Sequence, residues 1–66
     1  MTPFLFPRQQ QVAQLLAHGL SRQQIADEMG VTLETVKSHL KWVKLNLDAN
    51  NTTHAVAIAL RAGLID

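Results

Sequence analysis

The 66-residue sequence contains no cysteine and no tyrosine, and it has only three glycines and two prolines. The absence of cysteine excludes disulfide bonds and thiolate chemistry, and it fits a reducing cytoplasm. No apolar run is long enough to span a bilayer, because Arg61 interrupts the longest one. The N-terminus also lacks the basic start and cleavage site of a signal peptide. We therefore expect a cytoplasmic chain that does not contact a membrane.

The sequence also lacks the residue patterns on which catalysis and metal binding depend. It has no paired carboxylates, and Ser21 has no neighbouring base that could activate it as a nucleophile. His18, His39 and His54 do not have the spacing of metal ligands. The chain is therefore not expected to be an enzyme or to bind a metal, a cofactor or a small-molecule ligand.

Charge is scarce, since Lys and Arg number six, Asp and Glu number five, and the formal net charge is only +1. That balance is low for a nucleic-acid-binding protein, so an electrostatic argument must depend on where the charges lie. The length allows one domain, over residues 1–66, with a core of marginal size.

The most informative stretch is residues 31–47, VTLETVKSHLKWVKLNL, which predicts a helix with two different faces. Four apolar residues recur at the spacing of a core-facing stripe: Val36, Leu40, Val43 and Leu47. Lys37, Lys41 and Lys44 line one flank, and no acidic residue lies between Glu34 and Asp48. A helix that is buried on one side and cationic on the other suits the DNA major groove, which admits one α-helix.

Start and stop signals divide the chain into an all-α arrangement. The predicted helices are at about residues 7–18, 22–29, 33–47 and 52–62. Ser21 and Gln24 form a capping box, Gly30 ends the second helix in a left-handed turn, and Thr32 and Asn51 cap the third and fourth helices. The short connection around Gly30 predicts that the second and third helices form a helix-turn-helix unit.

The fourth predicted helix is apolar on more than one face, which is difficult to bury within so small a chain. A symmetric partner helix is the natural cover, so we expect a homodimer. The predicted interface consists of Val56, Ile58, Ala59, Leu60 and Ala62. After this helix, Leu64 and Ile65 are expected to fold back onto the core.

From Leu5 to Ile65 the sequence resembles the LuxR/GerE-type, or FixJ/NarL-like, helix-turn-helix DNA-binding domain of bacterial or phage regulators. The matching pieces are Pro7-Arg8, VAQLLAHGLS, Ile25-Ala26, Gly30-Val31, Thr35-Val36-Lys37-x-His39, Leu47, Ala55-Val56, Ala59 and Gly63-Leu64-Ile65. The resemblance implies a four-helix domain related to winged-helix DNA-binding proteins but without a wing. It also implies a sequence-specific transcription regulator that binds double-stranded DNA as a dimer on an inverted repeat and is associated with the nucleoid.

The resemblance assigns roles to individual positions of this sequence. Lys37, Ser38 and Lys41 match positions that usually face base edges in the major groove. Positions near phosphates are matched by Ser21, Arg22, Gln23, Thr35, His39 and Lys44. For the start of the second helix, elementary physics agrees, because its free N–H groups and positive dipole end favour a phosphate.

Several positions depart from the family pattern. Phe6 replaces a usual threonine cap, and Gln9 and Gln11 replace usual glutamates. Usual basic positions are occupied by Leu45, Asn46 and Thr52, which should weaken phosphate neutralisation. Trp42 stands where a small or polar residue is usual, and it either packs under the N-terminal arm or marks a partner surface.

Two alternatives to the DNA-binding function remain open at this point. One is a small regulator that keeps the fold but binds another protein, for example a related transcription factor, through Trp42 and Leu45 or through the fourth helix. The other is a promoter-recognition piece resembling region 4 of a sigma factor, against which His39 and the apolar fourth helix argue.

Overall fold

The computed structural model describes residues 3–66, which form four α-helices. They are α1 (Pro7–Ala17), α2 (Arg22–Met29), α3 (Leu33–Asn46) and α4 (Thr52–Arg61). No strand occurs within these described residues, so the all-α, four-helix prediction is confirmed. Helices α1, α3 and α4 each end one residue earlier than predicted. Within residues 3–66, no helix is both long enough and apolar enough to cross a membrane.

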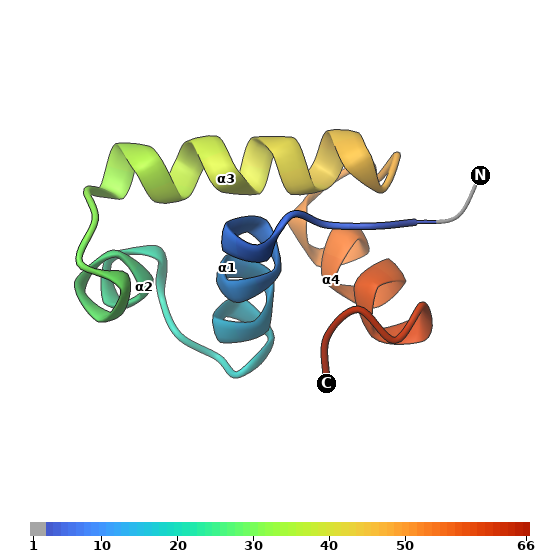
Figure 1. Cartoon of the computed structure of the whole chain (residues 1–66), viewed down its shortest axis with the longest axis horizontal. Helices are drawn as coiled ribbons and strands as arrows, with labels where there is room; N and C mark the ends of the chain where they lie inside the picture. The colour runs from blue at the N-terminus through green and yellow to red at the C-terminus, as the bar shows by residue number, and fades with distance from the viewer. Residues whose placement is uncertain (1–2) are drawn as a thin grey trace.

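Helix α3 extends along one side of the molecule, and the other three helices lie against it from the opposite side (Figure 1). In that view α2, α1 and α4 follow one another along the length of α3. This arrangement covers one face of α3 along its length, and it leaves the opposite face of the same helix open to solvent.

Side-chain caps explain where three of the helices begin. Ser21 Oγ accepts a hydrogen bond from the Gln24 backbone N–H at 3.1 Å, and Gln24 Oε1 accepts one from the Ser21 N–H at 2.8 Å. This pair is the predicted capping box, which satisfies two donors at the helix start. Thr32 and Asn51 cap α3 and α4 in the same way, through bonds from the third residue after the cap.

The core consists of two clusters that share α1 and α3. Beside α4, the buried residues are Ala13, Val43, Leu47, Ala55, Ala59 and Ile65. Beside α2, they are Val12, Ile25, Ala26, Val36 and Leu40. The predicted apolar stripe of α3 is therefore buried along its whole length, two residues in each cluster. Leu64 and Ile65 do fold back onto the first cluster, as the sequence predicts.

The turn between α2 and α3 depends on Gly30, which has a φ of 69° in the left-handed region. A residue without Cβ adopts this conformation at little cost. The turn is closed by a hydrogen bond of 3.0 Å from the Val31 N–H to the Ala26 carbonyl. The small side chain of Ala26 lets the two helices approach each other, and their contact leaves it only 1% exposed. The predicted helix-turn-helix unit is therefore present.

The start of α1 is stabilised by a contact that the sequence did not predict. Phe6 offers no side-chain cap, but its N–H donates to Gln9 Oε1 at 3.3 Å. The same oxygen accepts a hydrogen bond of 2.7 Å from Asn46 Nδ2, at the far end of α3. Gln9 is 9% exposed and is the one buried polar side chain among the described residues. It therefore joins the start of α1 to the end of α3.

Replacing Gln9 by leucine is expected to lower the free energy of unfolding by about 1–2 kcal/mol, because the Phe6 N–H and the Asn46 amide lose their shared acceptor. Gln9→Glu keeps the acceptor and places a negative charge in the first turn of α1, so its stability should equal or exceed that of the parent. The unfolding free energies of both variants are measured by urea denaturation, monitored by the far-ultraviolet circular dichroism signal of the helices. Gln11→Leu, at an exposed position of the same helix, is the matched control. Equal losses in Gln9→Leu and Gln11→Leu would contradict this role.

Candidate nucleic-acid interface

The outer face of α3 carries the residues predicted to contact bases. Lys37, Ser38 and Lys41 are all exposed, whereas Val36 and Leu40 on the inner face are buried. Residues three or four positions apart on a helix are neighbours, so Ser38 and Lys41 adjoin each other, as do Lys37 and Lys41. The fold therefore brings the three side chains together on one solvent-exposed surface.

The charge on this surface is positive along most of its length. Lys37 Nζ lies 3.8 Å from Glu34 Oε1, and the two side chains are 55% and 84% exposed. An ion pair this exposed contributes little free energy, so Lys37 can exchange its partner readily. Within residues 3–66, Lys41 and Lys44 form no ion pair. Two lysines of α3 therefore present uncompensated charge to solvent.

The remaining predicted contacts on α3 lie to either side of its outer face. Thr35 and His39, four residues apart, share one side of the helix and are half-buried. Lys44 is also half-buried and lies on the side of Lys37, seven residues earlier. Side chains that flank a central face in this way are placed where the two walls of a groove would approach the helix.

A second group of predicted contacts lies at the start of α2. Ser21, Arg22 and Gln23 are exposed, but each already makes an internal hydrogen bond. Ser21 caps the helix, and Gln23 Nε2 donates to Asp27 Oδ1 at 3.1 Å. The backbone N–H groups of the first turn and the Arg22 guanidinium are therefore the groups best suited to an anion here.

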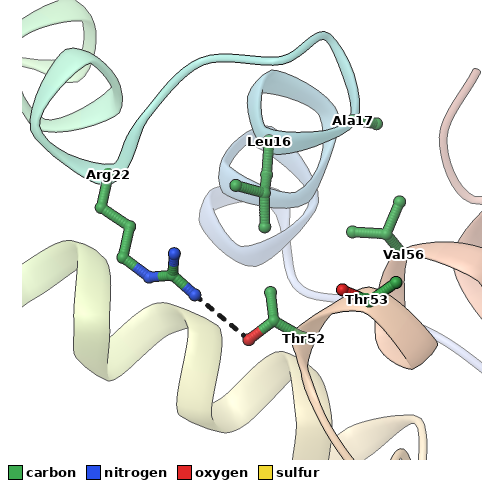
Figure 2. Close-up of a pocket in the computed structure, with 6 residues that line it drawn as sticks. All are labelled: Leu16, Ala17, Arg22, Thr52, Thr53 and Val56. Carbon is green, nitrogen blue, oxygen red and sulfur yellow. Dashed lines mark hydrogen bonds between the residues drawn. The ribbon is translucent and has the colours of Figure 1, made fainter.

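Arg22 extends from α2 toward α4, where its Nη2 donates to Thr52 Oγ1 at 3.3 Å (Figure 2). Beside it lies an open cavity of about 360 Å³ between the end of α1 and the starts of α2 and α4. Its lining consists of Leu16, Ala17, Arg22, Thr52, Thr53 and Val56. Sequence reasoning missed this contact because Arg22 and Thr52 are 30 residues apart, and no local pattern links them.

The residues predicted to form a dimer interface on α4 are not all available at the surface. Leu60 is 46% exposed and Ala62 is exposed, whereas Val56 and Ile58 are half-buried against the core. Ala59 is 0% exposed, because it packs between α1 and α3 in the first core cluster. The prediction that Ala59 lies in the interface is therefore wrong, since a buried methyl group cannot contact a partner.

Trp42 and Leu45 remain 53% and 58% exposed on the outer side of α3. Residues 3–6, the described part of the N-terminal arm, leave more than half of the tryptophan exposed, and Phe4 and Phe6 pack against each other edge to face, with ring centroids 5.4 Å apart. Within residues 3–66, Trp42 is therefore not buried beneath this arm, contrary to one interpretation of the sequence. Both rings of the arm are themselves at least half exposed.

The three histidines are dispersed, and within residues 3–66 no three His, Cys, Asp or Glu side chains are grouped as metal ligands. His18 Nε2 lies 2.9 Å from Gln14 Nε2, and His54 Nδ1 accepts from the Asn50 N–H at 3.1 Å. These contacts give His18 and His54 local structural roles at helix ends.

Comparison with known proteins identifies the family. The family described as bacterial regulatory proteins, luxR family, matches residues 4–59. Transcriptional regulatory protein YdfI of Bacillus subtilis is 41% identical over 54 residues, which are 82% of this chain and 25% of that protein. Two-component response regulator PprB of Pseudomonas aeruginosa is 45% identical over 56 residues, 85% of this chain and 20% of PprB. The chain thus spans a quarter or less of these two relatives.

Solved structures share the same fold. The transcription factor GerE superposes with a TM-score of 0.90 over 94% of this chain and 92% of that chain, at 24% identity. The LuxR-type receptor VqmA of Vibrio cholerae gives 0.87 over 96% of this chain and 28% of that chain, at 28% identity. The resemblance seen in the sequence is therefore confirmed, and the chain belongs to the luxR family of bacterial regulatory proteins, as a GerE-type helix-turn-helix DNA-binding domain.

Proposed function

We propose that the chain binds duplex DNA sequence-specifically and thereby regulates transcription, with α3 in the major groove. The observation that carries the proposal is the contrast between the two faces of α3, one buried along its length and the other exposing Lys37, Ser38 and Lys41. The major groove is about 12 Å wide and admits one α-helix. Membership of the luxR family supports the same function.

In this arrangement Lys37, Ser38 and Lys41 contact base edges, and a second set of residues contacts phosphates. The phosphate-contacting set consists of Ser21, Arg22, Gln23, Thr35, His39 and Lys44. Phosphate contacts fix the position of the protein on the duplex, while base contacts distinguish sequences. Ser21 contributes through its hydroxyl hydrogen, because its Oγ accepts the capping bond and its backbone N–H already donates to Gln24.

We further propose that the chain acts as a single domain that forms a homodimer through α4 on an inverted repeat. Val56, Ile58, Leu60 and Ala62 form the contact, with Leu60 the most exposed large apolar side chain of that helix. Two α3 helices about 34 Å apart would then enter successive major grooves. VqmA, one of the structural neighbours, is described as a dimer in the absence of its target DNA. Bacterial chromosomal DNA lies in the nucleoid, within the cytoplasm, so we propose that the chain is cytoplasmic and associated with the nucleoid.

Selection of bound duplexes from a random DNA pool by the purified chain tests the proposal. A two-fold-symmetric motif should be enriched, and a salt titration should show tighter binding to this motif than to scrambled DNA at every salt concentration. If folded protein enriches no sequence at low salt, the DNA-binding proposal fails. Enrichment of a single half-site without symmetry would contradict only the proposed homodimer and leave the proposed DNA binding intact.

A second candidate function is supported by the exposure of Trp42 and Leu45, which is 53% and 58%. Such a pair can anchor a protein partner, for example a related transcription factor. A stable complex with that partner, together with DNA binding no tighter than non-specific levels, would favour this function. Because Trp42 lies one turn beyond Ser38 on α3, the partner and DNA would compete for one surface.

A further inference from the structure

Trp42 occupies a position on α3 that any DNA in contact with Ser38 must approach. The two residues are four positions apart and therefore lie on the same face, one turn of helix from each other. Trp42 is 53% exposed in the described chain. When a partner removes such a large, exposed aromatic side chain from water, the free energy of the complex is lowered.

The charges around Trp42 indicate what kind of partner this is. Lys41 is adjacent in sequence and lies on the same outer half of α3, and no acidic residue occurs between Glu34 and Asp48. A protein surface that buries the indole must also find counter-charges for the neighbouring lysine. The major groove of DNA offers both at once, because phosphates line its edges and the thymine C5-methyl groups provide apolar contacts on its floor.

Helix geometry places this contact relative to the other base contacts. Four residues of α-helix rise about 6 Å, and base pairs in B-DNA rise about 3.4 Å, so Trp42 lies about two base pairs beyond the pair that faces Ser38. We propose that Trp42 is a specificity-determining residue that contacts a thymine C5-methyl group at that position. The inference depends on the proposed function and extends it to a position where family members usually have a small or polar residue.

Replacing thymines of the selected duplex one at a time by deoxyuridine tests the inference, because it removes the C5-methyl group and leaves base pairing intact. For the parent chain, one such replacement per half-site should weaken binding about fourfold, which corresponds to the ~0.8 kcal/mol of one buried CH₂ group. Trp42→Ala should bind the parent duplex more weakly and should not distinguish thymine from deoxyuridine at that position. Trp42→Phe, which retains an apolar ring, should keep part of the discrimination.

Phe4→Ala is the matched control, because Phe4 is an equally exposed aromatic residue, 50% exposed, that lies outside α3. It should respond to deoxyuridine as the parent does. If Trp42→Ala keeps the parental pattern, or if no thymine in the site is sensitive, the inference is wrong while the proposed DNA-binding function stands. If the parent chain selects no DNA sequence, the thymine contact and the proposed DNA-binding function are both wrong, and the exposed Trp42 is then assigned to a protein partner.

Discussion

Replacing Ile25 by alanine is expected to leave the chain close to unfolding. Ile25 is 0% exposed and packs with Val12, Ala26, Val36 and Leu40 between α1, α2 and α3. Truncation of a fully buried isoleucine costs about 2–5 kcal/mol, partly through lost burial and partly through the cavity that remains. The core of a domain below about 70 residues rarely supplies more than about 3–5 kcal/mol. One substitution can therefore remove most of the available stability.

Urea denaturation followed by far-ultraviolet circular dichroism measures this effect. Leu45→Ala is the matched control, because it also truncates an aliphatic side chain but at a position that is 58% exposed. Its midpoint should stay near that of the parent, since surface substitutions usually change stability by less than about 0.5 kcal/mol. Similar midpoints for Ile25→Ala and Leu45→Ala would show that the cluster beside α2 does not stabilise the fold.

Local signals in the sequence were sufficient to place the helices. Ser21, Thr32 and Asn51 each accept a hydrogen bond from the residue three positions later, so the start of each helix is decided within four residues. The buried stripe of α3 follows from residue spacing alone, because a helix repeats every 3.6 residues. These features need no knowledge of distant parts of the chain, which explains why they were predictable.

Contacts between distant residues could not be predicted in the same way. The bond from Asn46 to Gln9 spans 37 residues, and the bond from Arg22 to Thr52 spans 30. In the sequence Gln9 stands out only as a replacement of a usual glutamate, yet it is buried, and its side chain is hydrogen-bonded to the end of α3. A signal was present in hindsight: α1 lacks a side-chain cap at Phe6, so another acceptor near its start was required.

The spacing of apolar residues also could not predict which small residues are buried within the chain itself. Ala59 lies on the apolar stripe of α4, and a stripe does not reveal whether its own chain or a second copy covers it. In the structure the core cluster of α1, α3 and α4 covers it, so the proposed dimer contact rests on the more exposed Leu60 and its neighbours. The same ambiguity applied to Trp42, whose exposure depends on the path of residues 3–6. For such residues the sequence fixes a face of the helix but not what covers it.

The two faces of α3 have separable roles, which makes the DNA contacts testable without loss of the fold. Lys37→Ala and Lys41→Ala change only exposed side chains, so both variants should unfold at nearly the urea concentration of the parent. Any loss of DNA affinity can then be assigned to the contact itself. Circular dichroism of each variant provides this check before binding is measured.

On the selected duplex, Lys37→Ala and Lys41→Ala should each weaken binding by about 1–3 kcal/mol, and each should relax the preference at one base pair. We expect a slightly larger loss for Lys41, because Lys37 must first leave its exposed and therefore weak pair with Glu34, which lies 3.8 Å away in the free chain. Glu34→Gln should act in the opposite direction and tighten binding, since it removes a negative charge from the surface that approaches phosphates.

Fluorescence anisotropy titrations at two salt concentrations, on the selected duplex and on its single-base variants, measure these effects. Lys44→Ala is the comparison variant for a phosphate contact: it should weaken binding on every duplex by the same factor and lower the slope of log affinity against log salt by about one. If Lys37→Ala and Lys41→Ala behave like Lys44→Ala, they contact only phosphates. Sequence preference would then have to come from Ser38, from Trp42 or from the shape of the DNA.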